Sequence, residues 1–336
     1  MSSTESPDTA TAAALPVPPA GAGAPDELVD WVALASPPRL TLAVRSPADR
    51  PETQPGAAAS DREPALFVHG LGGSSQNWSE LMSLLADRLD GVALDLPGFG
   101  ESPPPDDGNY AVCAQARAVI RYLDATGRGP VHLLGNSMGG AAVTRVAAVR
   151  PDLVRTLTLI SPALPELPPQ RTALPTALLA IPGVARLFAR LTREWTPEQR
   201  TREVLALCYG DPARITPEGF GAAAEEYARR LQLPYFWEAM ERATRGLVNA
   251  YTLGGQHGLW RQAERVLAPT LLVYGGRDRL VSSRMARRAA AAFRGSRLLT
   301  LPEAGHVAMM EYPEAVARAV RELIDAAGAR PAADGG

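Results

Sequence analysis

The sequence predicts an α/β protein in which a mostly parallel sheet carries helices on both faces and a helical cap is inserted late in the chain. Two patterns predict this fold. From residue 64 onward, short apolar runs alternate with amphipathic stretches, which is typical of parallel strands buried on both faces. Residues 161–262 then interrupt the alternation with helical and proline-rich sequence that contains no convincing strand.

The expected elements follow one another in the order of this alternation. Strands are predicted at residues 30–35, 40–45, 65–68, 92–94, 131–134, 156–160, 270–274 and 297–301. Helices are predicted at residues 76–89, 110–125, 138–149, 282–293 and 313–326. Ligands bind beyond the carboxyl ends of the strands in such sheets, so the loops after the strands are where chemistry is expected.

Composition divides the chain into regions. Residues 1–27 and 327–336 are expected to be disordered tails, and residues 47–64 a long surface loop. The core then comprises residues 28–160 and 263–326, and the cap comprises residues 161–262. The cap contains ten of the 19 aromatic residues, which favours an apolar lining for a substrate pocket, although a small cap also needs aromatics for its own core.

Charge and residue usage exclude several classes of function. The net charge is −2, which argues against a nucleic-acid binder, and all 34 basic residues are Arg. Without any Lys, the chain is neither a pyridoxal-phosphate enzyme nor a P-loop NTPase nor a protein kinase. Cys113 and Cys208 form no disulfide framework, and no Cys/His cluster suggests a metal site. No apolar run could span a membrane and no secretion signal is visible, so a cytoplasmic location is expected.

The first chemical motif is a candidate nucleophile. Gly135-Asn136-Ser137-Met138-Gly139 lies between a predicted strand and a predicted helix, which is the setting of a nucleophile elbow. The turn is tight, so the neighbouring positions must be nearly free of side chains, which explains the two glycines. Ser137 is therefore the candidate nucleophile, at a helix N-terminus that favours a developing negative charge.

A serine hydroxyl needs a base to take its proton, and the base needs an orienting acid. His306 follows the last predicted strand, and Asp278 follows the strand before it. The two loops should lie side by side, and the order Ser137, Asp278, His306 is the one expected for this kind of site. Nothing in the sequence positions His132 or His257 as the base, or Glu303 or Asp152 as the orienting acid.

The fourth component is an oxyanion hole. The glycine-rich turn after His69 could direct a backbone N–H at the reacting oxygen, so the N–H groups of Leu71 and Met138 are the expected donors. The His69 side chain itself is expected to be structural. Residues 95–102 form a further glycine-containing turn, to which we assign no catalytic role.

Four motifs, taken in order, resemble the alpha/beta-hydrolase fold family over residues 30–326: the His69-Gly70 turn, residues 95–102, the Ser137 elbow and the Asp278/His306 pair. The resemblance implies an eight-stranded, mostly parallel sheet with a helical cap after the sixth strand, and it implies no cofactor. With serine rather than aspartate at the elbow, the default reaction in the family is hydrolysis of a carboxylic ester through an acyl-enzyme. A small apolar substrate is the expected partner, while the oligomeric state is left open.

Three alternatives remain. The string Gly135-Asn136-Ser137-Met138-Gly139-Gly140 is similar to the elbow of the meta-cleavage-product hydrolases, which break carbon–carbon bonds. Those enzymes usually carry Trp where Val307 stands and Asn in the loop that here reads Phe99-Gly100-Glu101. Cofactor-free haloperoxidase or perhydrolase activity would use the same triad. A ligand receptor built on this scaffold would belong to a different functional class.

Overall fold

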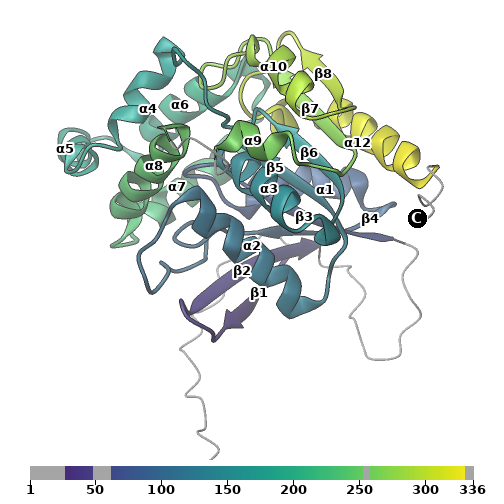
Figure 1. Ribbon diagram of the computed structural model, residues 1–336. Coiled ribbons are helices and arrows are strands. Elements are labelled where there is room, and N and C mark those ends of the chain that lie inside the picture. The colour runs from purple at the N-terminus through teal and green to yellow at the C-terminus, as the bar shows by residue number, and fades with distance from the viewer. Residues whose placement is uncertain (1–26, 48–61, 253–257, 330–336) are drawn as a thin grey trace, which may run out of the picture.

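An eight-stranded, mostly parallel sheet forms the centre of the molecule and confirms the predicted fold class (Figure 1). The computed structural model describes residues 27–47, 62–252 and 258–329. The strand order is β1-β2-β4-β3-β5-β6-β7-β8, in which β1 and β2 are antiparallel to each other, β2 is antiparallel to β4, and the remaining pairs are parallel. The strands are β1 (Glu27–Leu34), β2 (Leu40–Pro47), β3 (Glu63–Val68), β4 (Leu89–Leu94), β5 (Val131–Asn136), β6 (Val154–Ile160), β7 (Thr270–Gly275) and β8 (Arg297–Leu301).

Helices cover both faces of this sheet, as expected for buried parallel strands. One layer contains α2 (Val112–Thr126), α3 (Ser137–Val149), α9 (Leu259–Ala263) and α10 (Met285–Ala292). The other contains α1 (Ser79–Leu85), α11 (Ala308–Glu311) and α12 (Pro313–Gly328). Short 3-10 turns also occur in the described part of the chain: η1 (Ser75–Trp78), η2 (Pro151–Leu153), η3 (Arg171–Ala173) and η4 (Pro212–Arg214).

Strand β3 illustrates why these apolar runs form a central sheet. Ala65 and Phe67 pack toward the α1 and α12 layer, whereas Leu66 and Val68 pack toward the α2 and α3 layer. All four side chains are fully buried. A strand alternates its side chains between two faces, so only a strand with helices on both sides buries such a continuous apolar run.

The structure corrects one predicted helix and leaves some regions untested. The helix predicted at 76–89 is a 3-10 turn followed by α1, which ends at Leu85, because Leu89 already pairs with Glu63 in the sheet. Most of the predicted tails and of the 47–64 loop lies outside the described residues. At their described ends these regions are regular structure instead, because β1 begins at Glu27, β2 runs to Pro47, β3 begins at Glu63 and α12 runs to Gly328.

Helices occupy the described residues between β6 and β7, where the sequence predicts a cap. They are α4 (Leu174–Leu178), α5 (Val184–Leu191), α6 (Pro197–Cys208), α7 (Pro217–Leu231) and α8 (Phe236–Thr252), followed by α9. Figure 1 shows α4 to α8 gathered to one side of the sheet, while α9 lies beside α3. The domain limits at residues 161 and 262 remain a proposal.

Several cap aromatics pack on one another. The ring of Trp237 contacts those of Phe188 and Phe236, with centroids 5.6 and 5.0 Å apart, and Phe236 contacts Tyr227 at 6.0 Å. Phe236 is buried, so the rings of Tyr227, Phe236 and Trp237 give the cap an apolar core of its own, while Phe188 packs on it from an exposed position. Other cap aromatics pack instead against the main core below: Tyr235, Tyr251 and Trp260.

Candidate active site

Ser137 lies at the sharp turn between β5 and α3. Its φ angle is +53°, which is uncommon for a residue with a side chain and marks a strained backbone. A Cβ atom on Gly135 would lie 2.5 Å from Val143 Cγ2, and one on Gly139 would collide with the backbone carbonyl oxygens of Val68 and His69. Both glycines are therefore needed for α3 to begin this close to β3 and β5, as the elbow motif predicts.

His306 and Asp278 meet in the loops that follow β8 and β7. The Nδ1 atom of His306 lies 2.9 and 3.1 Å from the two carboxylate oxygens of Asp278, and both side chains are buried. The N–H groups of Leu280 and Val281 also donate to Asp278, at 2.8 and 2.9 Å. Because an ionised carboxylate only accepts hydrogen bonds, Nδ1 carries the proton and Nε2 of the neutral ring is left to accept one.

The charge state of Asp278 fits this arrangement. Burial by itself raises the pKa of the carboxyl group, but the adjacent His306 and the backbone N–H of Val281 outweigh it, and the pKa lies below its ordinary value. Asp278 therefore stays ionised around neutral pH and can hold His306 in one orientation.

Asn136 connects the serine turn to the histidine loop. Its side-chain amide donates to the carbonyl oxygen of His306 and to that of Ile160, each at 3.0 Å. The residue immediately before Ser137 thus fixes the backbone of His306 directly. No role for Asn136 could be predicted from the sequence, because its partner lies 170 positions away along the chain.

Glu311 holds the histidine loop from the other side. Its carboxylate is buried and accepts from the N–H of Gly305 at 2.6 Å and from the N–H of Gly210 at 2.8 Å. The N–H of His306 donates to the carbonyl of Cys208 at 2.6 Å. A segment between α6 and α7 therefore lies directly on the histidine loop, and Glu311 joins the two backbones.

The glycine-rich turn after β3 lies against the serine. A Cβ atom on Gly70 would lie 3.0 Å from Ser137 Cβ, so the backbone approaches this closely only because Gly70 has no side chain. This places the turn that contains Leu71 beside the elbow that contains Met138. The role of their two N–H groups as oxyanion donors remains a proposal.

His69 is buried beneath this turn and has a structural role. Its Nε2 accepts from the N–H of Leu96 at 3.0 Å, so Nδ1 carries the proton and donates to the carbonyl of Gly70 at 2.7 Å. Burial lowers the pKa of His69, which keeps the ring neutral. Both ring nitrogens are used within the backbone of the site, in agreement with the prediction for this side chain.

Arginines of α7 reach the same turn from the cap. Arg230 donates to the carbonyl of Gly72, and to Ser74 Oγ at 2.9 Å. Arg229 donates to the carbonyl of Gly100 at 3.0 Å. Both guanidinium groups donate to Glu226, Arg229 from Nε at 2.7 Å and Arg230 from Nε at 2.8 Å.

Glu226 is the buried anion of this cluster. Burial raises its pKa, but the hydrogen bonds and charges of Arg229 and Arg230 outweigh that effect and lower it to about 2. The cluster Glu226, Arg229 and Arg230 thus stays charged at neutral pH and anchors α7 to the loops that follow β3 and β4.

Residues 64–313 match the family model for the alpha/beta hydrolase fold. The chain belongs to this family.

Two curated relatives lie within it. A dihydrolipoyllysine-residue acetyltransferase component of an acetoin cleaving system, from Cupriavidus necator, is 30% identical over 251 residues, which cover 74% of this chain and 60% of the relative. The chain therefore spans about three fifths of that protein. An esterase of Mycobacterium tuberculosis is 26% identical over 272 residues, covering 77% of this chain and 82% of the relative.

A solved structure shows the same fold. The meta-cleavage product hydrolase of Pseudomonas fluorescens superposes with a TM-score of 0.66 at 18% identity, covering 86% of this chain and 95% of the other. At this identity, the likeness extends to the fold alone.

The remaining polar candidates of this alpha/beta hydrolase have other partners. Asp95 accepts from the N–H groups of Ser75 at 2.5 Å and Glu101 at 2.9 Å, which stabilises the turn at 95–102. His132 is buried and contacts Thr156 Oγ1 at 2.8 Å. Glu303 pairs with Arg277 at the surface, Asp152 pairs with Arg150, and His257 lies outside the described residues.

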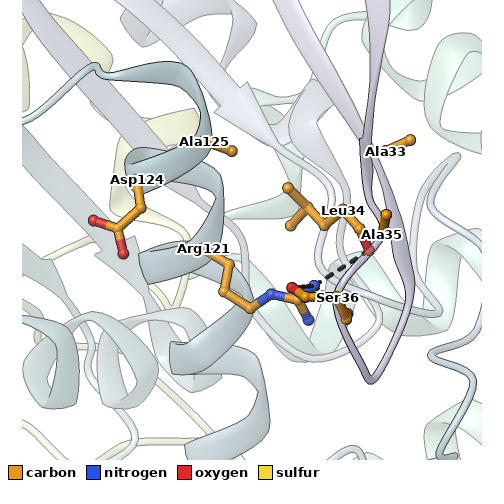
Figure 2. Close-up of a pocket in the computed structure, with 7 residues that line it drawn as sticks. All are labelled: Ala33, Leu34, Ala35, Ser36, Arg121, Asp124 and Ala125. Atoms are coloured by element: carbon orange, nitrogen blue, oxygen red, sulfur yellow. Dashed lines mark hydrogen bonds between the residues drawn. The ribbon is translucent and has the colours of Figure 1, made fainter. Parts of the chain in front are cut away.

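Two surface hollows lie away from the three catalytic candidates. One, of about 420 Å³, is lined by residues of β1, the following turn and α2 (Figure 2). There Arg121 donates to the carbonyl oxygens of Leu34 and Ser36, so its guanidinium is used to hold the β1–β2 connection. A second, of about 300 Å³, is lined by the 104–108 loop with Tyr235 and Arg242 of the cap. Neither is lined by Ser137, Asp278 or His306.

The described residues contain no group of three or more His, Cys, Asp or Glu side chains that could hold a metal ion. Among them, no helix combines the length and apolar character needed to cross a bilayer.

Proposed function

We propose that this chain is a serine hydrolase that cleaves a carboxylic ester of an apolar acyl or aryl substrate through an acyl-enzyme. The observation that carries the proposal is the buried His306–Asp278 hydrogen bond, held next to the strained Ser137 turn by the side chain of Asn136. A base with an orienting acid beside a serine at a helix N-terminus is the arrangement that nucleophilic acyl transfer needs.

In the first half of the reaction, Ser137 Oγ attacks the ester carbonyl carbon while His306 Nε2 takes the hydroxyl proton. Negative charge develops on the carbonyl oxygen, and the N–H groups of Leu71 and Met138 would stabilise it. His306 then gives its proton to the departing alcohol. Throughout this step, the ionised Asp278 stabilises the imidazolium.

In the second half, water attacks the acyl group on Ser137. His306 takes a proton from this water, the carboxylic acid leaves, and the serine hydroxyl is restored. The curated esterase relative supports the choice of an ester as substrate.

Apolar side chains near the turn support an apolar substrate. Met240 of α8 lies over the glycine-rich turn, since a Cβ atom on Gly72 would be 3.1 Å from its sulfur. Leu71 and Met240 are partly buried against the main core. A surface of this kind suits an acyl or aryl group better than a charged one.

The direct test is the hydrolysis of p-nitrophenyl esters from acetyl to palmitoyl by the wild type and by Ser137→Ala. We expect a short-to-medium chain optimum and a loss in kcat of about 10³-fold or more in the variant, because the nucleophile is removed. Ser83→Ala is the matched control, since Ser83 is exposed on α1 in the layer opposite α3.

Other outcomes of this assay would contradict the proposal. Equal ester rates in the wild type and Ser137→Ala would exclude the serine mechanism. Turnover of a ring-fission dienone without ester hydrolysis would favour carbon–carbon bond cleavage instead. Ligand binding without any turnover would favour a receptor.

A further inference from the structure

Large apolar side chains are exposed at one edge of the cap. Of the thirteen exposed large hydrophobic residues in the described part of the chain, seven lie within the 25 residues from 167 to 191. They are Leu167, Leu174, Leu178, Ile181, Leu187, Phe188 and Leu191. Isolated exposed leucines are common on protein surfaces, but a concentration of this kind marks an interaction surface. We call residues 167–193 the cap edge.

The cap edge also carries positive charge. It contains four arginines and no acidic residue, whereas the whole chain has a net charge of −2. The four are exposed: Arg171, Arg186, Arg190 and Arg193. Arg193 pairs with the neighbouring Glu194, while Arg171 and Arg190 form no ion pair with any residue that the structure describes.

Helix α5 combines both properties on its outer side. Leu187 and Leu191 are four residues apart and so lie on one side of the helix, with Arg186 and Arg190 in the adjacent row. The leucines are 54% and 72% exposed. The side of the helix that contains the buried Ala185 faces the cap, where α5 packs against α8.

The position of α5 leaves this side accessible. Figure 1 shows α5 at the outer extremity of the cap, away from the sheet, with α4 nearby. Both helices pack against α8, so the exposed residues of α4 belong to the same region: Leu174 and Leu178. The exposed leucines of α4 and the exposed leucines and arginines of α5 therefore form the outer part of the cap edge. Its first residues lie elsewhere, against the loop after β7, where Gln170 donates to the carbonyl of Asp278 and Arg284 donates to that of Pro168.

We propose that the cap edge docks onto the surface of an anionic lipid bilayer. The leucines would enter the boundary between headgroups and acyl chains, while the arginines contact the lipid phosphates. An apolar stripe flanked by cations is the pattern of helices that lie in a membrane interface without crossing it. This inference is independent of the chemistry proposed at Ser137.

The charge distribution favours a lipid surface over a second copy of the chain. In a two-fold dimer built on the outer side of α5, the same patch of both copies would meet, and Arg186 and Arg190 of one copy would lie close to those of the other. Such like-charge contact opposes association. An anionic bilayer supplies the opposite charge together with an apolar layer for the leucines.

The test is co-sedimentation with lipid vesicles. The wild type is mixed with phosphatidylcholine vesicles that contain about 30 mol% phosphatidylglycerol, or none, and we expect about tenfold stronger partitioning to the anionic ones. Leu187→Ser combined with Leu191→Ser should weaken this binding by about tenfold or more, because two apolar contacts are lost. Arg186→Gln combined with Arg190→Gln should weaken it by about tenfold as well.

Leu267→Ser is the matched control, because Leu267 is 78% exposed but lies on the core between α9 and β7. This control should bind vesicles as the wild type does. All of these variants should hydrolyse a water-soluble ester at the wild-type rate, so a defect in docking is distinguishable from a defect in catalysis.

Several results would overturn the proposal. These are no sedimentation of the wild type with anionic vesicles, equal binding to both vesicle compositions, or an equal loss in Leu267→Ser. A dimer in analytical ultracentrifugation that the Leu187→Ser and Leu191→Ser changes dissociate would identify a second copy as the partner instead.

Discussion

The loops around Ser137 and the cap edge represent two opposite ways of using a surface. Around Ser137, most polar groups are buried and have fixed partners, as His306 does with Asp278 and as Glu311 does with Gly305. At the cap edge, Leu187, Leu191 and Arg190 are exposed and have few partners within the chain. Chemistry that depends on fixed distances needs the first kind of surface. Binding to a deformable partner such as a lipid bilayer needs only exposed groups like those of the cap edge.

The largest effect is expected at Asp278, the acid beside His306. Asp278→Asn keeps the size of the side chain but removes the charge that orients His306 and stabilises its protonated form. We expect kcat for ester hydrolysis to fall by about 10³-fold, with a smaller change in KM.

Asp152→Asn is the control for this change, because Asp152 pairs with Arg150 in an exposed turn. Its steady-state kinetics should match those of the wild type. An Asp278→Asn variant with more than about a tenth of wild-type kcat would show that another residue orients the base.

The second effect is expected at Glu226, whose cluster with Arg229 and Arg230 anchors α7 to the loops that follow β3 and β4. Glu226→Gln leaves Arg229 and Arg230 without their buried anion, so the free energy of unfolding at pH 7 should fall by about 3 kcal/mol. Denaturant titration measures this loss. Glu194→Gln, which removes an exposed partner of Arg193, should leave the unfolding midpoint unchanged.

The loss of stability in Glu226→Gln should also depend on pH. Because the folded pKa of Glu226 is about 2 and its ordinary value is 4.5, the carboxylate stabilises the fold fully above pH 4.5. That contribution is lost as the pH falls toward 2. The stability difference between the wild type and Glu226→Gln should therefore shrink below pH 4.5, and a difference that grows there would contradict this account.

A smaller effect is expected at Asn136. Replacing it by Ala removes the amide that holds the carbonyl of His306, so the histidine loop gains freedom while the His306–Asp278 pair remains. We expect kcat to fall by about tenfold with little change in KM, since substrate contacts are retained.

Asn249→Ala is the matched control, because Asn249 is exposed on α8. It should leave both constants unchanged. Equal kcat in Asn136→Ala and the wild type would show that Asn136 does not position the base.

The smallest effect is expected at the cap edge itself. Leu191→Ser should change the free energy of unfolding by less than about 0.5 kcal/mol, because the side chain is already 72% exposed. By contrast, Leu133→Ala in β5 should cost about 3 kcal/mol, since that side chain is fully buried. A large loss at Leu191 in thermal or denaturant unfolding would mean that the cap edge is part of the folded core.

Much of the fold could be predicted from the sequence, because its signals are local. Continuous apolar strands and the glycines around Ser137 each report on a few neighbouring residues, and Asp278 and His306 could be found as loop residues after two predicted strands. The one helix that was misplaced, at 76–89, failed because Leu89 continues an apolar pattern but pairs with Glu63 in the sheet. The spacing of apolar residues within one segment does not show which residue that segment pairs with in the sheet.

The residues that support the site could not be predicted for the same reason. Asn136, Glu311 and Arg230 bind backbone groups far away along the chain, and no spacing rule connects them to their partners. The cap edge was also missed, since a leucine in an amphipathic pattern reads as buried. Only the structure shows that Leu187 and Leu191, on the outer side of α5, are exposed.

The central claim is that Ser137 forms a covalent intermediate, and labelling with an activated phosphonate ester tests it most directly. Such a reagent reacts with an activated serine and leaves a stable adduct that intact mass and peptide mapping can locate. We predict one adduct per chain on Ser137, with none on Ser137→Ala and strongly slowed labelling of His306→Ala. Labelling of a different residue, or ester turnover that continues with Ser137 unlabelled, would contradict the account.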